Sequence, residues 1–185
     1  MVLVHATSLA TRPSLIEWAN KKGRKLSFLI MDAPKAHNLQ LYLKECKRHN
    51  VVSMVRVCED TYPAEEVTRA GIDMHHMEYP DGDAPPQEII NQWLDVVDVT
   101  GGGGSSGGGA EGGGGGPTIA VHCVAGLGRA PVLVAIALIE SGMDPIHAVE
   151  YIRERRRGAI NRKQLTYLER YAPTRHRRRG TCAVM

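Results

Sequence analysis

The sequence predicts an α/β domain, with a central sheet flanked by helices, on two observations. Strand-like and helix-like hydrophobic patterns alternate along most of the 185 residues. In addition, a β-branched apolar run at 118–122 is followed by a glycine-containing loop and then by an apolar run of helix length at 130–142. Because layered α/β sheets place their sites at the carboxyl ends of strands, a site is expected at this loop.

The expected elements follow one another with short connections. Residues 1–24 are interpreted as a weakly structured extension with a short helix over 14–20, and the domain itself spans 25–172. Apolar residues recur at helical spacing around Trp93, so this side chain is expected in the core. Strands are expected near 26–31, 51–57, 72–77 and 118–122, and helices near 37–49, 63–70, 86–99, 130–142, 144–157 and 162–171.

Two segments differ in composition from the rest. The glycine-rich run at 101–116 is predicted to be a disordered insert, because it offers little to pack and contains no nucleotide-binding motif. The last segment, 173–185, is a basic tail. With 43% hydrophobic and 23% charged residues, the chain is typical of a globular domain. The first residues lack the pattern of a secretory signal, so a reducing cytosol is the expected environment.

The stretch from His122 to Arg129 has the features of a phosphate-binding loop. Cys123 and Arg129 bracket it, between the predicted strand and the predicted helix. Its backbone N–H groups can converge on one anion at the helix N-terminus, where the helix dipole also favours negative charge. The expected phosphate-binding residues are Val124, Ala125, Gly126, Leu127, Gly128 and Arg129.

This arrangement favours phosphoryl transfer to sulfur and then to water. A helix N-terminus and a neighbouring cation stabilise a thiolate, so Cys123 is expected to be the nucleophile. The planar guanidinium of Arg129 can hold two phosphate oxygens. A structural cysteine beside a helix-capping arginine is the alternative. A dinucleotide-binding turn is disfavoured, because Pro131 stands where its third glycine would be, and a P-loop lysine is absent.

The loop and several other segments together resemble one family. Ala130 follows the arginine, where most cysteine-dependent protein tyrosine phosphatases have Ser or Thr. Further matching segments lie at 55–59, 84–86, 122–137, 155–161, 163–165 and 182–185. The chain thus resembles the phosphatase of regenerating liver (PRL) family of prenylated protein tyrosine phosphatases, apart from the glycine insert. The resemblance implies a cysteine-dependent phosphatase fold with an HCxxGxxR loop, and hydrolysis of tyrosine or dual-specificity phosphate esters without cofactor or metal.

Protonation of the leaving oxygen requires a general acid, and a turn-rich loop holds two candidates. Counting forward without gaps from Cys58 along the family pattern favours Asp81, which also precedes Gly82. Counting back from Ala84 instead favours Gly82 or, with a gap, Asp83. Asp81 is the preferred candidate, although both aspartates could be surface turn residues.

The resemblance also gives Cys58 a role. In PRL-like chains, a cysteine at this place forms a reversible disulfide with the nucleophile, here Cys123, and protects it from further oxidation. From the sequence alone, Cys58 would be a small core residue, and Cys46 is interpreted as structural. His122 is expected to orient the loop. The four cysteines fit no zinc spacing, and the adjacent histidines at 75–76 face opposite ways, so no metal site is expected.

Ala130 predicts slow turnover. A hydroxyl at this position would hydrogen-bond the departing sulfur, so its absence lets the phosphocysteine intermediate accumulate. Slow chemistry leaves a second interpretation open. The resemblance implies binding to CBS-pair magnesium transporters, and the chain would then be a pseudophosphatase-like binding module that regulates such a transporter.

The tail predicts a membrane anchor. Residues 182–185 fit a CaaX prenylation pattern with Cys182 as the farnesyl acceptor, and an arginine-rich run at 175–179 precedes them. One lipid chain binds weakly, but basic side chains near an anionic leaflet add about 1 kcal/mol each. The chain is therefore expected on the cytoplasmic side of the plasma membrane or of endosomal membranes, and in the cytosol when unprenylated.

The expected partners are a phosphoprotein or phosphoinositide substrate and an anionic membrane surface. The arginines of the tail could instead form a nucleic-acid or nuclear-import patch. Aromatic residues make up 5% of the chain, which is poor in the stacking side chains that nucleic-acid sites use, so nucleic acid is not an expected partner.

Overall fold

A single mixed sheet organises the protein. The computed structural model describes residues 9, 11–21, 23–101 and 116–175. In this part of the chain, five strands lie in the order β1-β2-β5-β3-β4. The pair β1–β2 is antiparallel, and β2–β5, β5–β3 and β3–β4 are parallel. The strands are β1 (Ser14–Ala19), β2 (Lys25–Met31), β3 (Val51–Arg56), β4 (Asp73–His76) and β5 (Thr118–His122).

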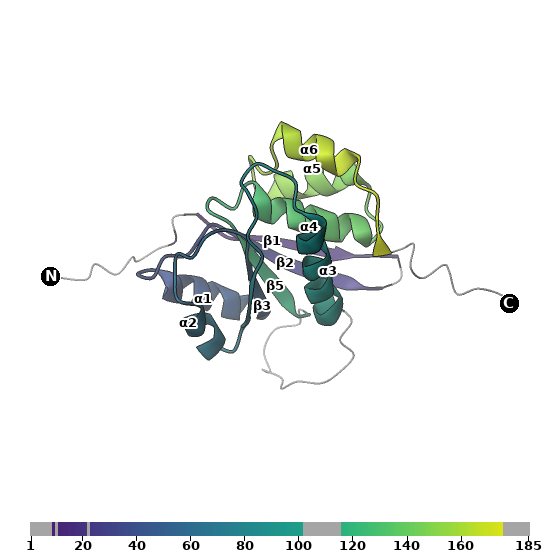
Figure 1. The fold of residues 1–185 in the computed structure, drawn as a ribbon. Helices are drawn as coiled ribbons and strands as arrows, with labels where there is room; N and C mark the ends of the chain where they lie inside the picture. Colours follow the sequence, from purple (N-terminus) through teal and green to yellow (C-terminus); the bar gives the residue numbers. More distant parts are fainter. Residues whose placement is uncertain (1–8, 10, 22, 102–115, 176–185) are drawn as a thin grey trace.

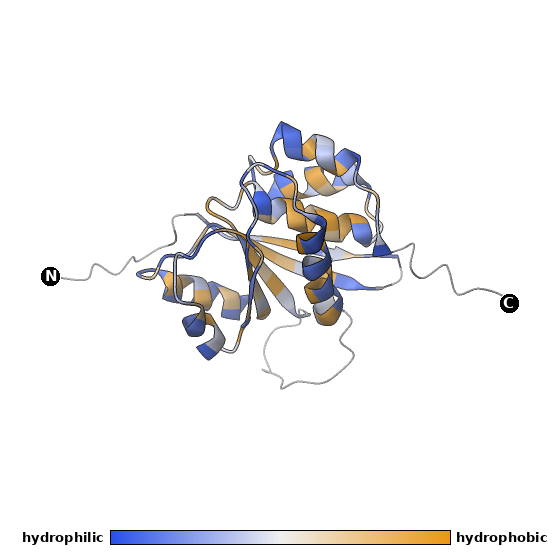
Figure 2. Ribbon diagram, in the orientation of Figure 1, coloured by the Kyte–Doolittle hydropathy of each residue, from blue (hydrophilic) through white to orange (hydrophobic). Residues whose placement is uncertain are grey.

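Helices cover both faces of the sheet (Figure 1). One face carries α1 (Leu39–Arg48) and α2 (Ala64–Arg69), and the other carries α3 (Gln87–Gly101), α4 (Arg129–Glu140), α5 (Pro145–Arg155) and α6 (Arg162–Glu169). Figure 2 shows the apolar residues of the helices turned toward the sheet. Each face therefore has its own hydrophobic core, and the α/β fold predicted from the sequence is confirmed.

The central strand β5 explains why the sheet is covered twice. All of its residues are buried. Ile119 and Val121 pack into the core under α3 to α6, whereas Ala120 packs into the core under α1 and α2. A strand buried on both faces has an almost continuous apolar sequence, as Thr118–His122 has. Trp93 of α3 is fully buried and donates from Nε1 to the Leu133 carbonyl at 2.7 Å, so its predicted core position is confirmed.

The helix predicted over 14–20, within a weakly structured extension, is wrong. Ser14–Ala19 forms the edge strand β1, whose register with β2 runs from Ser14 opposite Ile30 to Ala19 opposite Lys25. Ile16 is fully buried while Glu17 is exposed, which is the two-residue alternation of a half-buried strand. A tight turn brings the two strands together, and pairing across this hairpin overrides the weak local helical pattern.

The remaining predicted strands and helices are confirmed, with ends that differ by a few residues. Of the glycine-rich run, residues 102–115 lie outside the described residues, as do residues 176–185 with Cys182. In the described part of the chain, no helix is long and apolar enough to cross a membrane.

Candidate active site

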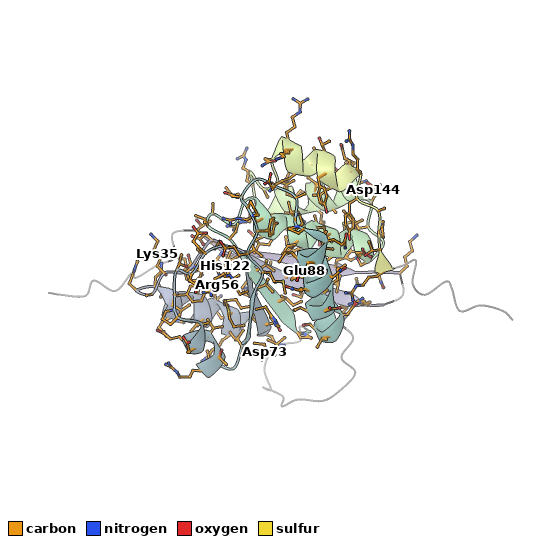
Figure 3. The ribbon with its side chains drawn as sticks, viewed as in Figure 1. Lys35, Arg56, Asp73, Glu88, His122 and Asp144 are labelled. Carbon is orange, nitrogen blue, oxygen red and sulfur yellow. The ribbon has the colours of Figure 1, made fainter. Side chains whose placement is uncertain are left out.

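The predicted phosphate loop connects β5 to α4 at the carboxyl edge of the parallel strands. β5 ends at His122 and α4 begins at Arg129. His122 lies opposite Arg56, the last residue of the neighbouring β3 (Figure 3). The loop therefore emerges from the middle of the sheet, where the fixed ends of three adjacent strands can hold it.

The carbonyl groups of the phosphate loop accept hydrogen bonds from residues outside the loop or from α4. None of the backbone N–H groups at 124–128 has a hydrogen-bond acceptor among the described residues. With the carbonyls bound and the N–H groups unbound, the loop is arranged to bind an anion. The bonds are Val57 N to His122 O (3.0 Å), Ala33 N to Val124 O (3.0 Å), Ile160 N to Leu127 O (2.7 Å), Val132 N to Gly128 O (3.1 Å) and the Tyr79 hydroxyl to Arg129 O (2.8 Å).

Two further carbonyls, those of Ala125 and Gly126, accept from the Arg156 side chain. Arg156 donates from Nε to Gly126 O at 2.5 Å and from Nη2 to Ala125 O at 3.0 Å. Gly126 has φ +67°, and a Cβ built on it would lie 2.3 Å from the Met31 carbonyl oxygen. Both the backbone conformation and the lack of space therefore require glycine at this position.

Cys123 and Arg129 are brought together by this loop. Cys123 is 3% exposed and its thiol is free. Arg129 is 5% exposed and donates from Nη1 to the Tyr79 carbonyl at 3.2 Å. Its buried Nε has no hydrogen-bond partner among the described residues, and Asp81 Oδ1 lies 3.4 Å away. A fixed guanidinium with an unused N–H group beside the loop is suited to binding a phosphate oxygen.

The two acid candidates have different surroundings. Asp81 lies on the wall of a cavity of about 540 Å³ that also includes Arg129. Asp83 does not line this cavity, and its Oδ1 is 2.5 Å from Lys163 Nζ. The other residues that line the cavity are Glu59, Glu78, Tyr79, Pro80 and Val124.

His122 is fully buried behind the loop and is neutral. Burial, with the positive charge of Arg56 adding to it, lowers the pKa of His122 to about 3. Its Nε2 lies 2.5 Å from the Tyr62 hydroxyl oxygen, and its Nδ1 lies 4.0 Å from Cys58 Sγ. A neutral, hydrogen-bonded ring at this position can hold the start of the loop without exchanging protons near neutral pH.

Cys58 follows β3 and is fully buried. Burial raises its pKa to about 11, although the charge of Arg129 opposes this shift. Both Cys58 and Cys123 are free thiols in this structure. The disulfide between them remains a prediction. Cys46 is also a buried free thiol, in α1 on the opposite face of the sheet.

Several side chains at the site were not identified from the sequence. Tyr79 holds Arg129 through its hydroxyl and its carbonyl. Gln164 closes the capping box of α6, and its buried amide Nε2 has no partner among the described residues. Arg156, one of the arginines at 153–157, is 4% exposed. The capping pattern at 161–164 could have indicated the role of Gln164 in the capping box. No local pattern indicates the burial of Arg156.

The predicted absence of a metal site remains an expectation. Among the described residues, no group of three or more His, Cys, Asp or Glu side chains is placed to hold a metal ion. His76 instead accepts a hydrogen bond from Arg56 at 3.1 Å and lies 3.3 Å from Glu78.

Comparisons with known proteins agree with this geometry. The model of the protein-tyrosine phosphatase family matches residues 28–171. The PRL-1 phosphatase of Drosophila melanogaster is 42% identical over 172 residues, which cover 93% of this chain and 89% of that protein. The human protein tyrosine phosphatase type IVA 3 is 40% identical over 181 residues, which cover 94% and 97%.

A solved structure gives the same result. A protein tyrosine phosphatase from Leishmania major superimposes with a TM-score of 0.75 at 39% identity and covers 88% of this chain and 99% of its own. None of these comparisons supports the alternative of a transporter-binding module. The chain belongs to the protein tyrosine phosphatases, and within them to the group of the PRL or type IVA enzymes.

Proposed function

We propose that the protein hydrolyses phosphate esters on phosphoproteins in two steps through a phosphocysteine at Cys123, and that the second step is slow. The observation that carries this proposal is the loop geometry. Its carbonyls accept hydrogen bonds from the surrounding structure, while its N–H groups and the Nε of Arg129, which lies 3.4 Å from Asp81 Oδ1, have no hydrogen-bond partner among the described residues. Such a loop stabilises the charge of the equatorial phosphoryl oxygens during transfer.

In the first step the Cys123 thiolate attacks phosphorus while the bond from phosphorus to the leaving oxygen breaks. Asp81 gives its proton to that oxygen, and the alcohol or phenol departs. In the second step water attacks phosphorus, the bond from sulfur to phosphorus breaks, and Asp81 takes the proton of the water. The position of Asp81, 3.4 Å from Arg129 Nε, supports its assignment over Asp83, which pairs with Lys163.

The second step is slow because Ala130 offers no hydroxyl to the departing sulfur. Ala130 is fully buried at the start of α4, in the same core as Cys123. The test is rapid-mixing kinetics with an aryl phosphate. We expect a burst of one phenol per enzyme, then slow turnover, and a faster steady state in Ala130→Ser. Ala135→Ser places a hydroxyl in the same helix away from Cys123 and is expected to leave the slow phase unchanged.

The burst experiment also separates the possible failures. A linear time course without a burst, in protein with a reduced Cys123, would show that hydrolysis of the intermediate is not rate-limiting. Absence of both product and burst would contradict the catalytic proposal itself. Phosphoproteins and phosphoinositides are distinguished by comparing a phosphopeptide with a short-chain phosphoinositide under the same conditions.

Two further properties are part of this proposal. A peroxide would oxidise the Cys123 thiolate to a sulfenic acid, and attack by the Cys58 thiol would then release water and form a reversible disulfide, which the burial of both thiols in one core supports. Farnesylation of Cys182 and the basic run before it would attach the protein to an anionic membrane, which the motif in the sequence supports. Incubation with a labelled farnesyl donor and farnesyltransferase, with Cys182→Ser as control, tests the second property.

A further inference from the structure

Arg156 follows directly after α5 and lies behind the phosphate loop. It is 4% exposed, although its neighbour Arg157 is exposed. The planar guanidinium of Arg156 donates along two of its edges to three different parts of the chain. Its acceptors are Gly126 O (2.5 Å), Ala125 O (3.0 Å), Arg12 O (3.3 Å), Ser14 Oγ (3.4 Å) and Ile30 O (3.5 Å).

The two short bonds fix the direction of the loop. The oxygens of Ala125 and Gly126 both point toward the Arg156 guanidinium and accept from it. A peptide unit is planar, so a carbonyl that is fixed on one side directs the N–H group of the same unit to the other side. The affected N–H groups belong to Gly126 and Leu127, two of the predicted phosphate donors.

The remaining bonds connect this arginine to the edge of the sheet. Nη1 lies near the carbonyl of Arg12 and the hydroxyl of Ser14, at the start of β1, and near Ile30 in β2. Ser14 in turn donates from its hydroxyl to the Arg155 carbonyl at 3.0 Å. The hairpin β1–β2 thus forms the fixed wall against which Arg156 holds the loop.

The charge of Arg156 is not neutralised by direct pairing. All five of its acceptors are uncharged, and among the described residues no carboxylate lies within ion-pair distance of it. Burial lowers its pKa, whereas Asp32 and the Cys123 sulfur act in the opposite direction. A buried cation is costly unless an anion is near, so a bound phosphate on the other side of the loop would be stabilised by it.

We propose that Arg156 is the positioning residue of the phosphate loop, holding the Ala125 and Gly126 carbonyls against the β1–β2 hairpin and adding a positive charge beneath the bound phosphate. This inference rests on the proposed function, because it assigns the phosphate to the same loop. Lysine cannot replace Arg156, since a single ammonium group cannot make two bonds in the fixed geometry of a guanidinium fork.

The test compares Arg156→Lys with the matched control Arg157→Lys. Both changes keep the charge, but Arg157 is exposed. The measurements are thermal unfolding, binding of inorganic phosphate or vanadate, and kcat and KM for an aryl phosphate. In Arg156→Lys we expect a folded protein whose vanadate affinity and kcat fall about 10- to 100-fold, because charge-assisted bonds that orient the loop are lost. In Arg157→Lys neither quantity is expected to change.

A second variant separates positioning from a structural role. Arg156→Ala leaves a space behind the loop, and millimolar methylguanidinium is expected to restore part of its vanadate binding, whereas methylammonium is not. Wild-type affinity and kcat in Arg156→Lys would overturn the proposal, and so would loss of activity only in proportion to the unfolded fraction. If the wild type binds vanadate but turns over no substrate, the proposed function fails, and the binding data still decide on Arg156.

Discussion

Substitution of Gly126 by alanine tests how the loop is built. A Cβ at this position would lie 2.3 Å from the Met31 carbonyl oxygen and 2.5 Å from Arg156 Nη2. Met31 is the last residue of β2 and pairs with His122, so its carbonyl cannot easily move. The loop itself must therefore shift by about 1 Å, a displacement that can cost a reaction roughly 100-fold in rate.

The same substitution also carries a backbone cost. Gly126 has φ +67°, and an alanine in the left-handed region costs roughly 1–2 kcal/mol. The matched control is Gly71→Ala, because Gly71 has φ +81° and no heavy atom within 4 Å of a built Cβ. Both variants are expected to lose stability in urea unfolding, but the loss of about 100-fold in kcat/KM is expected for Gly126→Ala alone.

The two measurements together are decisive. Wild-type kcat/KM in Gly126→Ala would refute the argument that contact with Met31 fixes the loop. A loss of activity in Gly71→Ala that matches the loss in Gly126→Ala would show that stability, not loop position, controls the rate. Vanadate affinity, measured on folded protein, is expected to follow kcat/KM.

Three other predictions concern the titratable groups of the site. Asp81→Asn is expected to lower kcat for a phosphotyrosine peptide by roughly 10²- to 10⁴-fold, and Asp83→Asn by less than about 3-fold. The reason is that the Asp81 carboxyl lies beside Arg129, whereas the Asp83 carboxyl pairs with Lys163, so equal losses would contradict the assignment of Asp81 as the acid. Because burial lowers the pKa of His122 to about 3, the unfolded chain binds a proton that the folded chain does not between about pH 6.5 and 3. The free energy of unfolding, measured in urea, should therefore fall as pH falls through this range, and more steeply in wild type than in His122→Asn. Equal slopes for the two proteins would refute the lowered pKa of His122. When Cys123 is held as a mixed disulfide with glutathione, attack by the Cys58 thiolate releases glutathione. The rate of this release should rise about tenfold per pH unit from pH 7 to 9, since burial raises the pKa of Cys58 to about 11. A rate that levels off near pH 8 would contradict the raised pKa.

The phosphate loop could be predicted because its chemistry is local. The strand, the glycines, Cys123, Arg129 and Pro131 are contiguous, and the N-terminus of α4 supplies the N–H groups whatever the rest of the fold does. The strands and helices were also predictable where their apolar periodicity was strong. In each of these cases the signal lies within a window of about twenty residues.

The parts that could not be predicted depend on residues far apart in the chain. β1 is a strand because it pairs with β2 across a hairpin. Arg156 is buried because the β1–β2 hairpin and the phosphate loop meet around it, and an arginine run looks the same whether or not one member is enclosed. Asp83 is drawn to Lys163, 80 positions away, so counting along the sequence could not separate it from Asp81.

The most direct test of the central claim is intact-mass analysis of the reduced protein during turnover of an aryl phosphate, followed by peptide mapping. We expect one added phosphoryl group that persists after the burst, maps to Cys123, and is absent in Cys123→Ser. A phosphoryl group on another residue, or product formation that continues in Cys123→Ser, would show that Cys123 is not the nucleophile.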